Sequence, residues 1–518
     1  MISLRDIALP RPLRSGGQQA DRSAMATPAA LWEENQHLQM RWNQLVGEQH
    51  RIKARLAEFI YQNQLEQEYL ASKIRIVNAQ LTEFTNALVA TKHRVPSISD
   101  NSDIQLDENG DIKAASRERL IEALFDTVQD RKDYISMFLL TYRYFATTNE
   151  VITECLDHYN RVAPSVTTAN CLAHIKAVNF LKKWVESFFD DFTENEEALG
   201  KCSRLIEAMS MTDTRLGPPF RIATALKNTF DKKNTAHKAG GEVKTMVASE
   251  NTPSFSERPP ASIPPKVANP QSVLDLDPQE VARQLTLIDY ELCRAIRPKE
   301  CLGLAWTKKD KLKRSPNLLA MIQGFNNVSR WVTYTLVTEL NLKKRTKILS
   351  FFLSVLQYLK NEHNNFNAVF AIVGGFGNSA VHRLNKTFNA LSENKLKILN
   401  EQKEFCDPTK SWANYRRAIT EVNPPCVPFV GVYQTDLTFI EEGNPDKFSA
   451  TGFINFKKCR MIAEVIVLIQ QYQQKPYNLL KCQPVTDFLK KEFEAATKME
   501  DKQMYERSLQ AEPRQPQN

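Results

Sequence analysis

Hydrophobic residues recur at helical spacing along most of this 518-residue chain. In the N-terminal part they recur every seven residues, at Leu31, Leu38, Leu45, Ile52 and Phe59. A second seam with a shifted heptad phase follows over residues 74–88. This pattern predicts a coiled coil over residues 28–94 with a stutter near residues 60–69. Self-association is our preferred interpretation, and a long amphipathic helix packed on its own protein is the alternative.

Two further helical regions are predicted, with a linker between them. After a polar break at residues 95–110, hydrophobic residues at helical spacing run from about Asp111 to Thr229, without the alternation typical of strands. The segment from Asp231 to Pro270 has six prolines and a Gly-Gly pair, which predicts a linker. The expected fold class is therefore all-α. The predicted parts are a disordered N-terminus (1–27), the coiled coil (28–94), a helical domain (108–230), the linker (231–270) and a second helical domain (271–514).

The second helical domain has a clear start and contains a predicted helical hairpin. Asp277 is a predicted N-cap, followed by Pro278 at the first helical position and by Glu280 as the glutamate of a capping box. Further along, three prolines precede a helix that is predicted to end at Gly443. A second helix follows, and we expect the two to be antiparallel and joined at Gly443-Asn444-Pro445.

The last turn of the first hairpin helix carries two acidic residues, Glu441 and Glu442. Acidic side chains are unfavourable there, because the free backbone carbonyls already concentrate negative charge. The only basic residue that follows closely is Lys447. A local rule broken without visible compensation marks a candidate functional site.

Composition excludes several classes of protein. Hydrophobic residues make up 42% of the chain and charged residues 25%, which predicts ordinary globular cores. The net charge of +8 is spread along the chain without a basic stripe, which argues against a nucleic-acid partner. Nine cysteines without a C-x-x-C pair argue against a disulfide framework and common zinc sites. We find no signal-peptide core and no apolar run long enough for a transmembrane segment, so we expect a cytoplasmic protein.

No motif for covalent chemistry is present. The chain lacks the G-x-x-x-x-G-K-[ST] loop of nucleotide-binding enzymes. The run Gly374-Gly375-Phe376-Gly377 follows a helical hydrophobic segment rather than a strand, which argues against a phosphate site. The histidines show no metal-binding spacing. We therefore expect no cofactor, no metal and no enzyme acting on a covalent bond, and we look for a recognition surface.

Two parts of the chain resemble known domains. Across residues 277–514 the chain resembles the catalytic domain of Ras-family guanine nucleotide exchange factors, the family that includes Son of sevenless. The segments that carry this resemblance are 277–306, 315–332, 364–376, 381–388, 423–446, 454–466 and 508–514. Residues 117–125 and 134–152 resemble the Ras exchanger motif domain that usually precedes it.

The resemblance implies a function and a mechanism. A protruding helical hairpin would enter the nucleotide site of a Ras-family small GTPase and promote GDP release and GTP loading. Glu442 would be the catalytic acid, because a carboxylate can replace phosphate as an acceptor of charge-assisted hydrogen bonds. Thr438 would crowd the magnesium site, where some members have leucine.

The resemblance also implies contact and supporting positions. The implied GTPase-binding residues are Phe429, Trp412, Thr435, Asn444, Gly377, Asn378 and Phe370. The implied structural support comes from Arg383, Asn423, Pro424, Pro425 and Gly443. Gly377 replaces the asparagine of many relatives, so a polar contact is either lost or moved to Asn378. Hairpin packing is the alternative role for Phe429, and a solvated surface acid is the alternative for Glu442.

Two other functions compete with nucleotide exchange. A non-catalytic GTPase-binding scaffold, dimerised by the coiled coil, is the alternative that Gly377 and Thr438 favour. Nucleic-acid binding is disfavoured by the mixed charge pattern. The expected partners are a Ras-family small GTPase and, through the coiled coil, a second copy or another chain. We also expect recruitment to the inner face of the plasma membrane, where such a GTPase is anchored.

Overall fold

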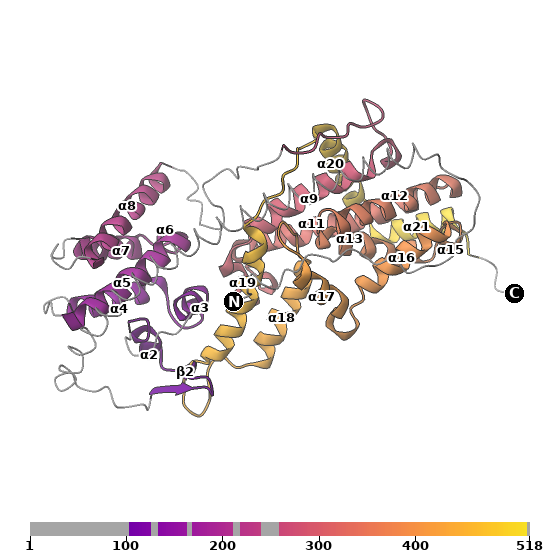
Figure 1. Cartoon of the computed structure of the whole chain (residues 1–518). Coiled ribbons are helices and arrows are strands. Elements are labelled where there is room, and N and C mark those ends of the chain that lie inside the picture. Colours follow the sequence, from indigo (N-terminus) through magenta and orange to yellow (C-terminus); the bar gives the residue numbers. More distant parts are fainter. Residues whose placement is uncertain (1–102, 126–132, 163–167, 211–217, 240–257, 515–518) are drawn as a thin grey trace, which may run out of the picture. The chain divides into compact units, whose positions relative to one another are not determined.

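The computed structural model describes residues 103–125, 133–162, 168–210, 218–239 and 258–514. These residues belong to one compact unit, 95–518. The predicted disordered N-terminus and coiled coil, and the middle of the predicted linker, lie outside the described residues. The described part is helical apart from one two-stranded sheet, which confirms the all-α class (Figure 1). None of its helices is both long and apolar enough to span a bilayer.

The first described elements are strands, where helix was predicted from Asp111. Strand β1 (Ile104–Leu106) pairs antiparallel with β2 (Ile112–Ala115). Between them Gly110 adopts a φ of +80°, and the Asp107 carboxylate accepts hydrogen bonds from the backbone of Asn109 and Asp111, both at 3.0 Å. An aspartate turn closed by a left-handed glycine joins strands too short to show alternation in the sequence.

The helices of the first domain surround an aromatic core. Phe138, Phe180 and Trp184 are fully buried within it. The helical elements are α2 (Arg117–Glu122), α3 (Tyr134–Thr141), η2 (Tyr142–Tyr144), α4 (Thr148–Val162), α5 (Thr168–Ser187), α6 (Asp190–Thr193), α7 (Glu196–Ser210) and α8 (Pro218–Lys238). Helix α8 continues past the predicted linker start at residue 231, because residues 231–238 contain no proline or glycine to end it.

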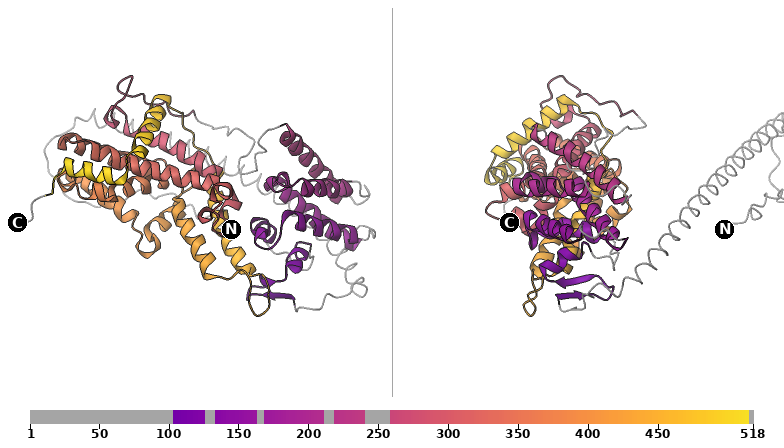
Figure 2. Two further views of the ribbon diagram at one scale, coloured as in Figure 1. Left: turned by 180° about the vertical axis from the view of Figure 1, so that it is seen from behind. Right: turned by 90° about the vertical axis from the view of Figure 1, so that its left-hand side faces the viewer.

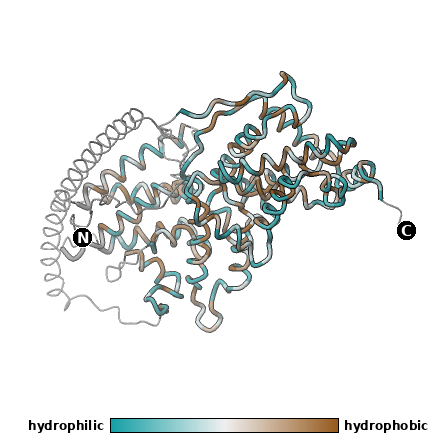
Figure 3. Tube along the Cα trace, turned by 45° about the vertical axis from the view of Figure 1, so that its right-hand side comes forward, coloured by the Kyte–Doolittle hydropathy of each residue, from teal (hydrophilic) through white to brown (hydrophobic). Residues whose placement is uncertain are grey.

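The second domain packs its helices around the long helix α11. Its first elements are η4 (Val273–Asp275), α9 (Pro278–Ala295), η5 (Pro298–Thr307), α10 (Lys311–Arg314), α11 (Pro316–Thr338), α12 (Leu342–Asn361), α13 (Phe366–Gly377), α14 (Ser379–His382) and α15 (Asn385–Asn389). Its remaining elements are α16 (Glu393–Phe405), η6 (Thr409–Ser411), α17 (Ala413–Glu421), α18 (Val430–Gly443), α19 (Phe456–Gln473), α20 (Gln483–Lys498) and α21 (Asp501–Ala511). Along these helices the trace changes repeatedly between hydrophobic and hydrophilic residues (Figure 3).

Local signals in this domain are partly confirmed. Asp277 caps α9 by accepting hydrogen bonds from the backbone of Gln279 (2.8 Å) and Glu280. Glu280 does not complete a capping box, because its buried carboxylate accepts instead from the Ile263 backbone (2.9 Å) and the Gln284 amide (2.7 Å). The Gln284 side-chain amide and the Ile263 backbone amide thus take the place of the Asp277 backbone amide as donors to this carboxylate.

The glycine run at the end of α13 serves helix packing. A Cβ atom on Gly375 would lie 2.8 Å from the backbone oxygen of Ser329 and 2.9 Å from Val332 Cβ, both on α11. Only glycine therefore allows α13 to approach α11 this closely. A Cβ on Gly374 would make an ordinary contact at 3.6 Å.

Helices α18 and α19 form the predicted hairpin, and both views show them side by side and projecting beyond the long helices (Figures 1 and 2). Their connection is longer than the predicted turn and comprises residues 444–455. Lys447 and Ile454 pair across it, and the Asn455 side chain donates to the Pro445 carbonyl at 3.0 Å. The connection is thus an extended loop whose two ends are joined by hydrogen bonds, rather than the short turn that Gly443-Asn444-Pro445 predicted.

Candidate functional site

The N-terminus of α18 is fixed by aromatic packing around Phe429. The Phe429 ring stacks on Phe370 at 4.1 Å with 11° between the planes, and the Tyr415 hydroxyl accepts a hydrogen bond from its backbone at 2.9 Å. The ring also lies over Gly431, where a Cβ atom would come within 2.4 Å of it. Contacts with Phe370, Tyr415 and Gly431 therefore fix Phe429, which is still partly exposed.

One side of α18 packs against the rest of the molecule. With 100° of rotation per residue, Val430, Tyr433, Leu437 and Glu441 project to the same side. The first three are buried, and the Glu441 side chain is only 10% exposed. We call these four residues the inner face of α18.

The Glu441 carboxylate is enclosed by donors from three different elements. It accepts hydrogen bonds from the Tyr144 hydroxyl of η2 and from the Gly303 backbone of η5, the latter at 2.9 Å. Its other oxygen lies 2.6 Å from the ammonium group of Lys458 on α19. Lys458 in turn binds Asp446 at 2.7 Å. The compensation missing from the local sequence is therefore supplied by Lys458, not by Lys447.

Protonation follows from these contacts. Burial opposes the charge of Lys458, but the hydrogen bonds and charges of Asp446 and Glu441 outweigh it and raise the Lys458 pKa. Burial, reinforced by the hydrogen bond to Glu441, also raises the pKa of Tyr144. Tyr144 therefore stays a neutral hydrogen-bond donor and Lys458 stays a cation at neutral pH.

The other side of α18 presents polar groups to solvent. We call Thr435, Thr438, Phe439 and Glu442 its outer face, because they project away from Leu437. The threonine hydroxyls donate to their own helix, at 2.9 Å to Gly431 and 2.8 Å to Gln434. Glu442 is exposed, and its carboxylate has no hydrogen-bond or ion-pair partner within the described residues. The outer face thus carries an uncompensated acid at a helix C-terminus.

Among the remaining implied contact residues, two lie close to α18. Phe370 is 6% exposed beneath Phe429, so its place is in the aromatic cluster rather than on the surface. Asn444 follows α18 directly and donates to the Ile440 carbonyl at 3.0 Å. Trp412, half-buried at the start of α17, has a left-handed φ of 57°, as do Lys410 and Ser411 before it. Three successive left-handed residues form an unusual turn that fixes the Trp412 backbone.

Gly377 and Asn378 lie at the other end of α13 from Phe366. Gly377 is exposed, and a Cβ atom there would meet nothing within 4 Å. The Asn378 side chain accepts a hydrogen bond from the Ala380 backbone at 2.9 Å and so caps α14. This capping role uses the side-chain oxygen, and the side-chain NH₂ group has no hydrogen-bond partner within the described residues.

Comparison with known proteins decides the family. The RasGEF domain model matches residues 280–460, and the RasGEF N-terminal motif model matches residues 111–206. Ras guanine nucleotide exchange factor A of Dictyostelium discoideum is 31% identical over 445 residues, which cover 84% of this chain and 70% of that protein. The chain belongs to the Ras guanine nucleotide exchange factor family.

Other relatives are longer than this chain. Ras guanine nucleotide exchange factor P of Dictyostelium discoideum is 38% identical over 73% of this chain, and that match covers 25% of its own length. Protein son of sevenless of Drosophila melanogaster is 31% identical over 82% of this chain and 28% of its own length. The chain thus spans only about a quarter of these two relatives.

The residues implied to support the structure of this Ras exchange factor family member have different surroundings. Arg383 donates to the Ser508 carbonyl at 2.6 Å and to the Glu512 carbonyl at 2.7 Å, which ties α14 to the C-terminal helix. The Pro424–Pro425 peptide bond is cis, and Asn423 before it is exposed. Gly443 ends α18 as predicted but without a left-handed φ.

A buried ion pair near Arg383 escaped the sequence reasoning. Arg345 is fully buried and lies 3.1 Å from the Glu512 carboxylate, which also accepts from the Thr387 hydroxyl at 2.6 Å. An arginine in a lysine-rich helix start gives no local signal of burial, since its partner lies 167 residues away.

The first domain contacts the hairpin at several further points that the sequence reasoning did not predict. Ile454 of the hairpin connection exchanges backbone hydrogen bonds with Ala115 of β2, at 2.9 and 3.3 Å. Arg460 of α19 binds Asp107 and Asp111 in the β1–β2 turn, each at 3.1 Å. The hairpin of this exchange factor family member is therefore braced along α19 and its connection, which leaves the outer face of α18 open.

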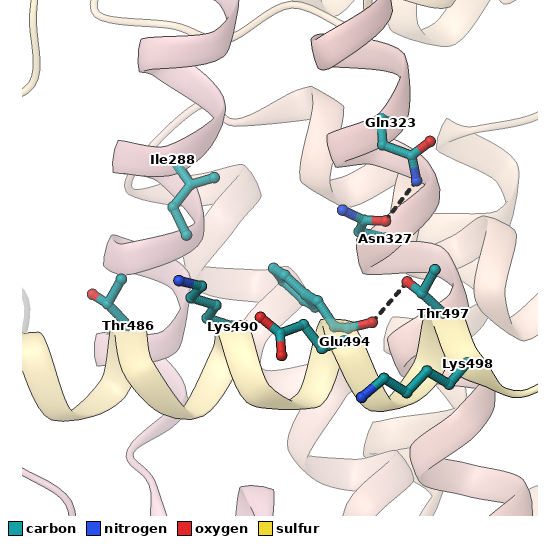
Figure 4. Close-up of a pocket in the computed structure, with 9 residues that line it drawn as sticks. Ile288, Gln323, Asn327, Thr486, Lys490, Glu494, Thr497 and Lys498 are labelled. Carbon is teal, nitrogen blue, oxygen red and sulfur yellow. Dashed lines mark hydrogen bonds between the residues drawn. The ribbon is translucent and has the colours of Figure 1, made fainter.

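A separate cavity of about 620 Å³ lies between α9, α11 and α20 (Figure 4). Its lining comprises Ile288, Gln323, Asn327 and six residues of α20. No residue of the predicted site lies among them. The candidate site on α18 therefore lies apart from this cavity.

Proposed function

We propose that this protein accelerates GDP release from a Ras-family small GTPase and so permits GTP to load. The observation that carries the proposal is the unpartnered Glu442 carboxylate on the outer face of a helix whose inner face is firmly held. Membership of the exchange factor family supports it. A rigid, exposed acid is suited to enter another protein's anion-binding site.

The proposed mechanism is a competition for phosphate-binding groups. The groups of the GTPase that hold phosphate can accept a carboxylate instead, since both form charge-assisted hydrogen bonds. Thr438, one turn before Glu442, would reach the adjacent magnesium site. By linkage, a factor that prefers the empty GTPase weakens nucleotide binding by the same ratio. The direction of loading then follows from which nucleotide is abundant.

This mechanism makes or breaks no covalent bond in the protein. Phe429, Trp412, Thr435 and Asn444 would add contacts around the inserted helix, with Phe370 supporting Phe429 from below. Self-association through residues 28–94 and recruitment to the membrane that holds the GTPase complete the proposal.

The test is fluorescent GDP release from a panel of GDP-loaded Ras-, Rap- and Ral-type GTPases. We expect acceleration of at least one, and a loss of at least about tenfold in Glu442→Ala, as for removal of one stabilising charged group. Thermal unfolding should be unchanged, because Glu442 is exposed and unpaired. Glu421→Ala, an exposed acid at the end of α17, is the matched control and should release GDP at the normal rate.

Two results would overturn parts of the proposal. An unchanged rate in Glu442→Ala removes the role of that carboxylate. Binding of a GTPase with no acceleration of GDP release by the wild-type protein would instead identify a scaffold.

A further inference from the structure

The outer face of α18 carries a large hydrophobic side chain among its polar residues. Phe439 is 69% exposed. The phenylalanines packed at the start of the same helix, Phe325, Phe370 and Phe429, are buried or half-buried in ring contacts with one another. Single exposed hydrophobic residues are common on protein surfaces, so the position of Phe439, rather than its exposure alone, is what points to a partner.

Helical geometry places this ring beside the proposed catalytic acid. Phe439 lies four residues after Thr435 and three before Glu442, so its side chain neighbours both of theirs on one side of α18. Leu437, on the opposite side, is 1% exposed. Phe439 has no ring contact or cation partner within the described residues, so nothing there holds or covers it.

The neighbouring charges do not explain the ring either. Asp436, adjacent on the helix, is engaged by the Arg416 guanidinium at 2.6 and 2.9 Å. The inner-face network around Glu441 lies on the other side of the helix. Phe439 could be changed without disturbing either group.

We propose that Phe439 is a further GTPase-binding residue, which packs on an apolar surface of the GTPase next to the groups that receive Glu442. This inference rests on the proposed function and names a contact that the family resemblance did not imply. Aromatic residues are enriched at the buried centres of interfaces, and a ring beside a charged contact keeps water from it. Phe439 would therefore strengthen the complex, while Glu442 would act on nucleotide release within it.

The experiment measures GDP release over a range of concentrations of the full-length protein. In Phe439→Ala we expect the half-saturating concentration to rise at least about tenfold, as for the loss of an aromatic anchor, with a smaller change in the maximal rate. Phe439→Leu should recover most of the affinity. Leu340→Ala, an exposed leucine between α11 and α12 that is 52% exposed, is the control and should change neither value by more than about twofold.

The outcomes separate this inference from the proposed function. If Glu442→Ala slows release but Phe439→Ala matches the wild type in both values, the inference fails and the proposed function stands. If the wild-type protein accelerates no GTPase, binding to nucleotide-free GTPase decides: weaker binding of Phe439→Ala supports the contact, and equal or absent binding overturns it. A lower mass of Phe439→Ala in sedimentation would place the ring between copies of this chain and also overturn it.

Discussion

The inner and outer faces of α18 each end in a glutamate, and the two glutamates have opposite surroundings. Glu441 is nearly buried and receives hydrogen bonds or charge from Tyr144, Gly303 and Lys458. Glu442, the next residue, is exposed and has no partner within the described residues. The same side chain at adjacent positions is thus bonded within the fold in one case and exposed without a partner in the other.

This difference shows how an acidic pair at a helix C-terminus should be interpreted. Each glutamate alone conflicts with the helix dipole. For Glu441 the conflict is relieved by a lysine on the next helix, so its position is explained by folding. Glu442 has no such partner within the described residues, and our proposal assigns that part to the GTPase. The comparison predicts that changes to the inner face alter stability first, whereas changes to the outer face alter exchange alone.

The largest expected effect is that of Glu441→Ala. The variant leaves Lys458 with Asp446 as its only charged partner and leaves the Tyr144 hydroxyl without its acceptor, whereas the Gly303 amide still donates to the Tyr144 oxygen at 2.8 Å. Because breaking a buried pair exposes the remaining charge to an apolar setting, we expect a loss of about 3 kcal/mol in unfolding free energy. GDP release should fall with it. Thermal unfolding and GDP release on the same samples measure both.

Tyr144→Phe is the milder companion of that change. It keeps the carboxylate–lysine pair and removes the hydroxyl that donates to Glu441 and accepts from the Gly303 backbone, at a cost of about 1–2 kcal/mol, because the Gly303 amide still donates to Glu441. A Glu441→Ala protein with unchanged stability and lost exchange would erase the distinction between the two faces.

Next in size is Gly431→Ala, which tests how the start of α18 is held. A Cβ atom there would lie 2.4 Å from the Phe429 ring, and the ring cannot move away freely because Phe370 stacks on it. We expect displacement of Phe429 and a loss of about 1–3 kcal/mol, the usual range for overpacking. Chemical denaturation measures the loss, and GDP release should slow as the helix start shifts.

Gly443→Ala is the matched control on the same helix. A Cβ atom at Gly443 meets nothing within 4 Å, so stability should change by no more than about 0.5 kcal/mol. Because alanine has the higher helix propensity, propensity cannot cause a loss in either variant. Equal losses in the two glycine variants would therefore show that the contact with Phe429 is not what makes Gly431 important.

Much of the fold was predictable because hydrophobic spacing and local caps act over short distances. The N-cap at Asp277 and the end of α18 at Gly443 are examples. The strands β1 and β2 were not predicted, since segments of three and four residues give no alternation to detect. The bond between Ala115 and Ile454 was also beyond local reasoning, because it joins residues that are far apart in the sequence.

The candidate site was predictable to a similar extent and for similar reasons. The family resemblance pointed to Glu442 and Thr438, and the structure adds their common outward direction. The partner of Glu441 was missed because Lys458 lies beyond a connection whose length was underestimated. Phe439 gave no signal in the sequence: it projects to the same side of α18 as Val432, seven residues earlier, and Val432 is buried.

The smallest effect is expected for Thr438→Leu, which tests the role of the outer face. The Thr438 hydroxyl donates only to the Gln434 carbonyl of its own helix, so its loss leaves no buried group unpaired. Leucine also favours the helix by a few tenths of a kcal/mol, and stability should be unchanged or slightly higher. If Thr438 crowds the magnesium site, the larger side chain should speed maximal GDP release by about two- to fivefold, a barrier change of less than about 1 kcal/mol.

Single-turnover GDP release at saturating exchange factor measures this, and Gln434→Leu, which lies one turn earlier on α18, is the control for added hydrophobic surface. A slower rate in Thr438→Leu would show that the hydroxyl, rather than the bulk at this position, contributes to exchange.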